Sequence, residues 1–216
     1  MSFSALPDTV TVAEKEYHIE SDFRASISFE ILANDPDKSE EEIALGMLDL
    51  YFPQYAGRFL TVTEDDEPEL VFLAVHAGGA INQLLEFYRG GGANGKNRKS
   101  GGKRRLYDFA LDEAYLYASF LQAYQIDLRT EALHWWNFKS LFSALPQDTI
   151  FGNILHIRSM KLNSKMSKEE KAYYQKLKRV YALPEKISER QQQEDDALAA
   201  VLMGSGDLAE LEVNKN

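Results

Sequence analysis

The stretch Glu131-Ala-Leu-His-Trp-Trp-Asn-Phe-Lys-Ser-Leu-Phe-Ser-Ala-Leu145 decides the class of fold. Its large apolar side chains recur at the spacing of three and four residues that gives a helix one buried face, and this predicts an aromatic helix over 131–145. Adjacent side chains on a helix point about 100° apart. We therefore expect one of Trp135 and Trp136 to enter the core and the other to lie at its edge.

Helix start signals continue the helical pattern on both sides of this stretch. Ser39 with Glu42, and Ser167 with Glu170, have the S-x-x-E spacing of a capping box, in which both side chains satisfy free backbone N–H groups of the first turn. Predicted helices follow Ser21 or Asp22, follow Ser39, and cover 69–89, 112–124 and 131–145. Another starts at Asp148 or Thr149 and includes Ile157, and the last starts at the Ser167 signal and runs through Tyr181. Within 69–89 the pair Gly78-Gly79 indicates a kink or a close packing contact, so this segment is predicted as one long helix or as two.

Two short runs at the N-terminus have the composition of strands. Thr9–Val12 and Tyr17–Ile19 contain β-branched and aromatic residues, and they predict a hairpin with a loop of about four residues over 13–16. The expected fold class is mainly α, a bundle of about six to eight helices with a small N-terminal β-hairpin.

Composition divides the chain into four regions. Residues 1–89 hold the hairpin and the first helices, 90–104 form a glycine-rich basic linker or loop, and 105–184 form an aromatic-rich helical region expected to pack against the first. Residues 185–216 contain eight acidic and three basic residues, which predicts a flexible acidic tail in which 197–203 could add a short helix.

The overall composition argues against several classes of function. The chain has 216 residues, a net charge of −10 and no cysteine, which disfavours general binding to nucleic acid and excludes thiol chemistry and cysteine-based metal sites. His18, His76, His134 and His156 lack the spacing of a helical metal site, so we expect no metal and no cofactor. With no membrane span or secretory signal predicted, the expected location is the cytoplasm.

One segment resembles a phosphate-binding loop in its first seven positions only. Gly90-x4-Gly95-Lys96 is followed by Asn97 where a P-loop has Ser or Thr, and it follows a predicted helix instead of a strand, so a nucleotide site is not expected. The bases around it are Lys96, Arg98, Lys99, Lys103, Arg104 and Arg105. They form either a soluble loop or a patch for phosphates or an acidic partner, and the second reading predicts that Lys96→Ala with Arg98→Ala abolishes function.

Four stretches together resemble a known family of phage proteins. They are Tyr17–Leu32, which begins Tyr-His-Ile-Glu-Ser-Asp-Phe-Arg, then Phe109–Leu128, then Leu133-His-Trp-Trp-Asn-Phe-Lys139, and Met166–Pro184. Read over residues 8–184, the chain is similar to the bacteriophage "gene product fifteen" family of phages and prophages of Gram-positive bacteria. That family commonly has glycine at the position of Gln125.

The resemblance implies a protein of the tail-gene cluster, where tail-assembly chaperones are expected, and no catalytic residues. The implied function is a non-enzymatic chaperone or accessory protein that binds the tape-measure protein or another tail protein in the host cytoplasm, with a homo-oligomer possible; the alternative is a structural subunit of the virion, in the tail or connector. Helical proteins cover apolar helices through aromatic grooves. The candidate partner-binding residues are Trp135, Trp136, Phe138, Phe142, Tyr115 and Tyr124, each of which could instead be plain core.

Overall fold

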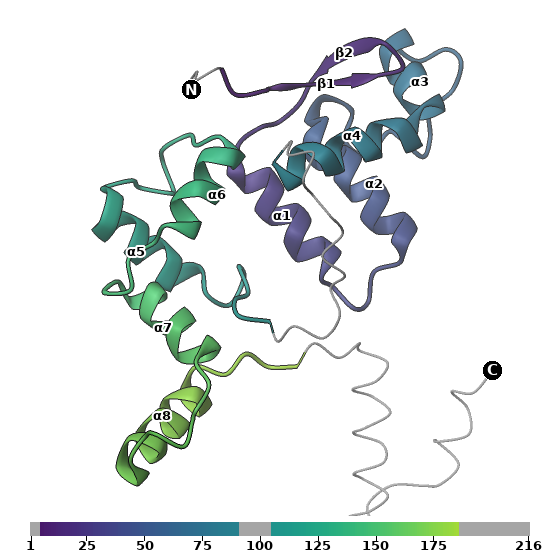
Figure 1. The fold of residues 1–216 in the computed structure, drawn as a ribbon. Coiled ribbons are helices and arrows are strands. Elements are labelled where there is room, and N and C mark those ends of the chain that lie inside the picture. Colours follow the sequence, from purple (N-terminus) through teal and green to yellow (C-terminus); the bar gives the residue numbers. More distant parts are fainter. Residues whose placement is uncertain (1–4, 91–104, 186–216) are drawn as a thin grey trace, which may run out of the picture.

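The computed structural model describes residues 5–90 and 105–185, and in these residues the protein is mainly α-helical (Figure 1). The described elements are the strands β1 (Thr9–Val12) and β2 (Lys15–His18), the helices α1 (Phe23–Ala33), α2 (Glu40–Tyr51), α3 (Pro68–Val75), α4 (Ala77–Arg89), α5 (Glu113–Tyr124), α6 (Trp135–Ser143), α7 (Ile150–Ser159) and α8 (Lys168–Val180), and the short 3₁₀ helix η1 (Pro53–Tyr55). The predicted fold class is confirmed.

Local capping chemistry fixes where most helices begin. Both predicted capping boxes are formed, Ser39 with Glu42 at α2 and Ser167 with Glu170 at α8. Asp22 caps α1 by accepting the backbone N–H of Arg24, and Thr149 caps α7 by accepting that of Gly152. Because these side chains satisfy donors that a helix cannot pair internally, the helix starts were readable from sequence.

The hairpin loop is shorter than predicted. Val12 pairs with Lys15, which leaves a loop of two residues and not four. Ala13 and Glu14 both adopt positive φ, at 44° and 68°. Two left-handed residues in succession make the tight turn that suits a two-residue hairpin, although neither is the glycine or asparagine that usually announces it.

Two predicted helices have different bounds in the structure. The helix predicted over 69–89 is two helices, α3 and α4, bent by 83°. The break falls at His76, ahead of Gly78-Gly79. A Cβ at Gly79 would lie 3.9 Å from Val12 Cγ1, which is an ordinary van der Waals distance, and one at Gly78 would meet nothing within 4 Å, so neither glycine marks a close packing contact. The helix predicted over 131–145 begins only at Trp135, because the backbone of 131–133 is held by groups of the N-terminal region.

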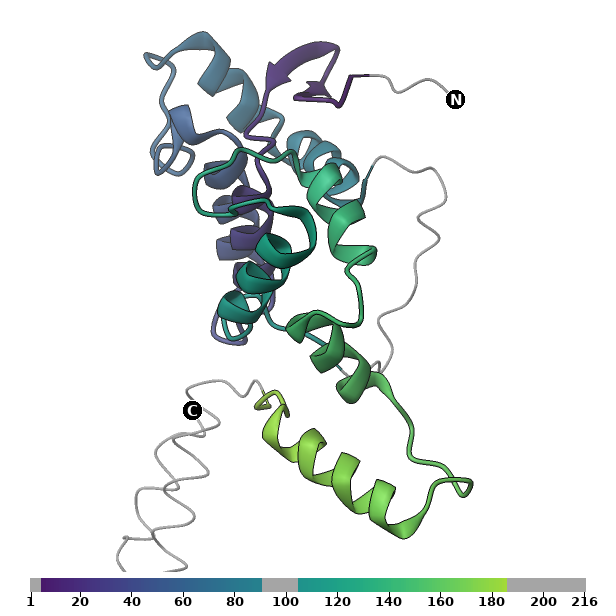
Figure 2. The same ribbon diagram turned by 90° about the vertical axis from the view of Figure 1, so that its left-hand side faces the viewer.

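One cluster of buried apolar side chains contains residues from both sides of the 91–104 gap. It includes Phe23, Tyr51 and Leu84 from the first half and Phe120 and Phe138 from the second. α1 packs against both α2 and α6, and the hairpin packs on α4. α8 contacts α7, has no buried residue, and extends away from the other helices (Figure 2).

Two regions proposed from composition lie almost wholly outside the described part of the chain. These are the basic linker of 90–104, of which only Gly90 is described, and the acidic tail of 185–216, of which only Glu185 is described. Within the described residues, no single helix is long and apolar enough to cross a membrane, and only the bent pair α3 and α4 reaches that length and composition together.

Candidate functional site

The Ser-Asp-Phe-Arg motif at 21–24 is hydrogen-bonded to the segment that leads into α6. Phe23 N–H donates to the carbonyl of Leu133 at 2.9 Å, and Trp135 N–H donates to the carbonyl of Ser21 at 2.8 Å. The Asp22 carboxylate accepts the N–H of Leu133 at 3.1 Å. Residues 21–24 and the segment before α6 lie far apart in the sequence and are therefore held together by these hydrogen bonds. We call this contact the joint.

Arg24 and His134 complete this joint on either side. The Arg24 guanidinium pairs with Asp22 at 2.9 Å and also donates to the carbonyls of Leu128 and Glu131. His134 is the N-cap of α6: its Nδ1 accepts the N–H of Trp136, so its Nε2 carries the proton that is donated to the carbonyl of Pro7 at 2.9 Å. His134 therefore has a capping role at the start of α6.

The two adjacent tryptophans bind the end of another helix. Trp135 Nε1 donates to the carbonyl of Tyr88 and Trp136 Nε1 donates to that of Phe87, each at 2.8 Å. Lys139 Nζ donates to the same Tyr88 carbonyl at 3.0 Å. The last carbonyls of a helix lack internal partners and carry negative partial charge, so these indole and ammonium groups cap the C-terminus of α4.

Burial changes the acid–base behaviour of the groups around this cap. Desolvation lowers the pKa of Lys139, and the charge of Glu30 partly opposes that shift. The pKa of Tyr88 is strongly raised, first by burial and then by Glu30, to which its hydroxyl donates at 2.7 Å. Tyr88 is therefore a neutral donor at neutral pH, which is a structural role.

Phe138 is the centre of a stack of aromatic rings. Its ring stacks on Phe23 at a centroid distance of 4.7 Å, on Phe120 at 5.2 Å and on Trp135 at 5.7 Å. These partners come from α1, α5 and α6. Phe138 thus packs against residues of α1, α5 and α6. This packing makes the described core continuous across the joint.

The six predicted partner-binding residues divide by burial. Trp135 and Phe138 are only 3% and 1% exposed and lie in the core, whereas Trp136, Phe142, Tyr115 and Tyr124 are half-buried. The Tyr124 hydroxyl donates to the carbonyl of Leu141, and the ring of Tyr115 lies edge-on to that of Tyr181. All six lie on α5 or α6, and Tyr115, near the start of α5, contacts Tyr181 at the end of α8. Contact of any of them with a partner stays a prediction.

A groove between α1 and α5 is a concave surface of the described residues that could receive a ligand. Its volume is about 330 Å³, and its lining residues are Phe23, Arg24, Ile27, Ser28, Phe109, Glu113, Leu116, Tyr117, Leu128 and Arg129. The floor is apolar and the charged groups stand at the rim, where the guanidinium of Arg129 lies over the ring of Tyr117. Sequence analysis did not single out this groove, because its walls come from helices about 90 residues apart.

The groove is continued by apolar side chains that are exposed. Ile31, which follows Arg24, Ile27 and Ser28 at helical spacing on α1, is 38% exposed, and Leu121, one turn after Tyr117 on α5, is 43% exposed. An apolar floor with exposed apolar extensions is typical of a surface that receives a helix or an extended segment. The helical spacing of residues 24, 27, 28 and 31 on α1 was the one pattern in the sequence that indicates this surface.

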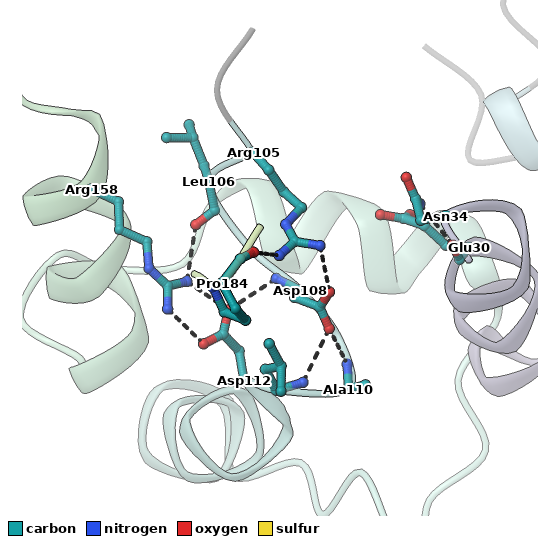
Figure 3. A network of polar contacts seen from close by, with 10 residues as sticks. Glu30, Asn34, Arg105, Leu106, Asp108, Ala110, Asp112, Arg158 and Pro184 are labelled. Carbon is teal, nitrogen blue, oxygen red and sulfur yellow. Dashed lines mark hydrogen bonds and ion pairs between the residues drawn. The ribbon is translucent and has the colours of Figure 1, made fainter. Parts of the chain in front are cut away.

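A second polar centre joins α5, α7 and the end of α8 (Figure 3). Arg158 is 7% exposed and forms two hydrogen bonds to the Asp112 carboxylate, at 2.6 Å and 2.9 Å. The same guanidinium donates to the carbonyls of Leu106 and Tyr181. Because all three of its nitrogens bind protein groups in this way, we interpret the pair as a structural joint.

Arg105 extends that joint to the residues that precede the tail. Its guanidinium pairs with Asp108 at 3.0 Å and donates to the carbonyl of Pro184 at 2.7 Å. The position of residue 184 is thereby fixed next to residue 105. In the described residues no three His, Asp or Glu side chains are grouped so that they could hold a metal ion.

A family profile described as Bacteriophage Gp15 protein matches residues 3–183. The chain belongs to the bacteriophage Gp15 protein family. The matched residues contain the whole joint between 21–24 and 128–135, the tryptophan cap of α4 and both walls of the groove, so these features belong to the family region. No curated protein and no solved structure matches the chain.

The backbone conformation at position 125 is one that favours glycine. Gln125 ends α5 in the left-handed conformation, with φ 57° and ψ 25°. Glycine adopts this conformation without the steric cost that a side chain brings. The glutamine at this position therefore carries a local strain at the end of α5.

Proposed function

We propose that this protein is a non-enzymatic tail-assembly chaperone that binds an apolar helical segment of the tape-measure protein, or of another tail protein, in the host cytoplasm. The observation that carries the proposal is the groove between α1 and α5, with its apolar floor and exposed apolar extensions. Membership in the Bacteriophage Gp15 protein family supports a phage role.

The physical need for such a protein follows from the nature of the proposed partner. A tape-measure protein is a very long helical chain, and its apolar stripe would aggregate unless it is covered before the tail tube assembles around it. A groove of about 330 Å³ has room for one or two large side chains of a docked helix. Repeated weak contacts of this kind would keep the stripe soluble and release it during assembly.

The charged residues at the rim of the groove restrict which partner segments can dock there. Arg24 and Arg129 stand at the rim with Glu113 among them, while the floor consists of aromatic and aliphatic side chains. A partner segment with an apolar stripe and an acidic residue beside it would match this arrangement. Arg24 already binds Asp22 and two carbonyls, so Arg129 is the rim cation better placed to meet an acidic partner residue.

Co-expression with the tape-measure protein of the same genome tests the proposal. The measurements are the soluble fraction of the tape-measure protein and the amount that co-purifies with this chain. We expect the tape-measure protein to become soluble and to co-purify. If it stays insoluble and nothing co-purifies, the chaperone function is wrong.

A groove-filling variant shows whether the groove is the binding surface. Ser28 is exposed and lines the groove, so Ser28→Trp should fill it without disturbing the core and should reduce co-purification by about tenfold, equivalent to about 1.4 kcal/mol. Asn153→Trp adds the same side chain at an exposed position of α7 and serves as the control. Equal losses in both variants would contradict the groove as the site.

The alternative function is a structural subunit of the virion, and mass spectrometry of purified particles separates the two. A chaperone leaves before the particle is complete, so we expect this chain to be absent. A stoichiometric amount in the finished particle would favour the structural role.

A further inference from the structure

Three apolar side chains on α8 lie on one face of the helix, which the described part of the chain leaves largely open to solvent. They are Tyr173, Leu177 and Val180, spaced four and three residues apart. Tyr173 is 60% exposed and Val180 is 64% exposed, while Leu177 is partly covered. We call these three residues the α8 stripe. An amphipathic helix with an open apolar face is the form of ligand that a helix-binding groove receives.

Two exposed charges of opposite sign line one edge of the α8 stripe. Glu169 lies one turn before Tyr173, and Lys176 lies one turn before Val180. In the described residues, neither of the two charged side chains forms an ion pair. Glu170, at the opposite edge, is already engaged in the capping box. The free edge therefore presents an acid and then a base in the direction of the chain.

The groove between α1 and α5 has the matching charges on its α5 side. The Arg129 guanidinium lies 4.4 Å from the centroid of the Tyr117 ring, and Glu113 stands one turn of α5 before Tyr117. Both charged residues are exposed, and within 5–90 and 105–185 neither forms an ion pair. A helix with an apolar stripe fits this groove when its acid meets Arg129 and its base meets Glu113.

We propose that α8 of a second copy of this chain docks in the groove between α1 and α5. Its α8 stripe covers the apolar floor, Glu169 pairs with Arg129, and Lys176 pairs with Glu113. The two charges of α8 are about 10 Å apart along the helix, and Glu113 is about 6 Å from the level of Tyr117, a difference that the flexible stem of a lysine spans. The docked α8 runs antiparallel to α5 of the receiving copy, because the acid comes first on α8 and second to none on α5 is the base.

The groove of the same molecule does not receive α8 while the contacts of the structure hold. Lys178 Nζ donates to the carbonyl of Arg158 at 3.1 Å, and Arg158 Nε donates to that of Tyr181 at 2.7 Å, so α8 is fixed on α7. Figure 2 shows that α8 extends away from α1, which forms one wall of the groove. The helix that enters a groove therefore comes from another copy.

The charge of α8 also favours its approach to a second copy. The helix contains five basic and two acidic residues, whereas the whole chain has a net charge of −10. The α8 of one copy is thus attracted to the acidic remainder of another. A single helix in a single groove is a smaller contact than the interface of a stable dimer, so we expect self-association that is weak and decreases with salt.

Self-association in this form would regulate the groove. The α8 of another copy covers the apolar floor while no partner is present, and an apolar helix of the tape-measure protein displaces it. This competition rests on the proposed function, whereas the docking of α8 does not.

Sedimentation velocity of the full-length protein, over a series of concentrations, tests the docking. Tyr173→Gln with Val180→Gln removes the α8 stripe without a change of charge, and Ser28→Trp fills the groove. Each variant should weaken self-association by at least about tenfold. Ala172→Gln on α8 and Asn153→Trp on α7 change exposed residues outside both surfaces and should leave it unchanged.

A mixture of the two weakened variants shows which surfaces meet. The stripe variant keeps an intact groove and the groove variant keeps an intact α8, so the mixture should associate although neither variant does so alone. Self-association of Ser28→Trp at the level of the unmodified protein would assign the contact to two α8 helices and overturn the proposal. An unmodified protein that is monomeric at every concentration, or a mixture that does not associate, would overturn it too.

A charge exchange tests the predicted ion pair. Glu169→Arg should weaken self-association by about two- to fivefold, the range of an exposed pair, and the addition of Arg129→Glu should restore it. Adding Lys161→Glu to Glu169→Arg gives the same net charge away from the groove and should not restore it. Restoration by both additions, or by neither, would contradict the pairing of Glu169 with Arg129.

Co-purification with the tape-measure protein separates this inference from the proposed function. The stripe variant should retain the tape-measure protein, because its groove is intact, whereas Ser28→Trp should lose both associations. Self-association through α8 without co-purification would support the docking and contradict the chaperone function. Loss of the tape-measure protein in the stripe variant would overturn the competition for the groove.

Discussion

The indole N–H of Trp135 donates to the carbonyl oxygen of Tyr88 at 2.8 Å, across 47 positions of sequence. This bond and its neighbour from Trp136 to Phe87 make the two tryptophans a cap for α4. The pair that is most characteristic of the sequence therefore positions the helix that leads into residues 91–104. The two tryptophans thereby hold α6, in the second half of the chain, against the end of α4, in the first half.

Trp135→Phe should destabilise the protein by about 1–3 kcal/mol, because it removes a buried donor while keeping an aromatic ring. Trp136→Phe removes the neighbouring donor at a half-buried position where water can replace it, and should cost less. Urea unfolding followed by circular dichroism measures both. An equal or larger loss in Trp136→Phe would show that the burial of the two indoles does not set their contributions.

Asp112→Asn should cost about 3–5 kcal/mol, since it leaves the buried Arg158 charge without its carboxylate partner. The exposed pair of Lys38 and Glu42 provides the comparison, and Lys38→Gln should change the unfolding midpoint several times less. Hydrogen exchange adds a local readout: amides near the end of α8 should exchange faster in Asp112→Asn, because Arg158 also binds the Tyr181 carbonyl. Unchanged exchange there would contradict the role of the pair as a joint.

The start of α2 should respond to acid. Hydrogen bonds from the Ser39 backbone, with those from Lys38 and the Ser39 hydroxyl, lower the pKa of Glu42 from 4.5 to about 2. A carboxylate whose pKa is lower in the folded state stabilises fully above the unfolded value, so this contribution is present above pH 4.5 and is lost as the pH falls toward 2. Glu42→Gln should flatten that part of the pH dependence of the unfolding midpoint.

Glu41→Gln is the control for the acid response, because it removes the same charge one residue away from the capping pair. It should leave the slope between pH 4.5 and 2 close to that of the unmodified protein. A slope that survives in Glu42→Gln would assign the acid response to other carboxylates.

Gln125→Gly should stabilise the protein by up to about 1 kcal/mol, because the left-handed conformation at the end of α5 costs a residue with a side chain more than it costs glycine. Gln122→Gly makes the same substitution at an exposed position inside α5 and should destabilise by about 1 kcal/mol. Thermal unfolding of the two variants measures this difference in sign. Destabilisation by both would mean that the unfolded-chain entropy of glycine outweighs the relief of strain at 125.

Features that depend on neighbouring residues were predictable from the sequence. Ser39 with Glu42 and Ser167 with Glu170 are local capping pairs, and both formed as expected. Helix geometry also predicted that one of the two tryptophans would be buried and the other would lie at the edge of the core. Trp135 is buried and Trp136 is half-buried. In each case the interaction that decides the outcome lies within a few residues along the chain.

Features set by tertiary contacts were not predictable. The start of α6 was placed at 131, because nothing local reveals that Leu133 binds Asp22 and Phe23 through its own N–H and carbonyl. The hairpin loop was misjudged because Ala13 and Glu14 adopt a turn that the sequence does not announce. The groove escaped notice for the same reason, since α1 and α5 become neighbours only in the folded chain.

The bond between Asp22 and Leu133 also sets an order of events during synthesis. These residues are 111 positions apart, and a ribosome that adds about 5–20 residues per second takes about 5–20 s to make the second after the first. Until then the carboxylate that caps α1 lacks the N–H of Leu133, and the ring of Phe23 has no Phe138 to stack on. The first half of the nascent chain therefore keeps part of its apolar surface uncovered. That surface is covered only after residues 133–138 have been synthesised.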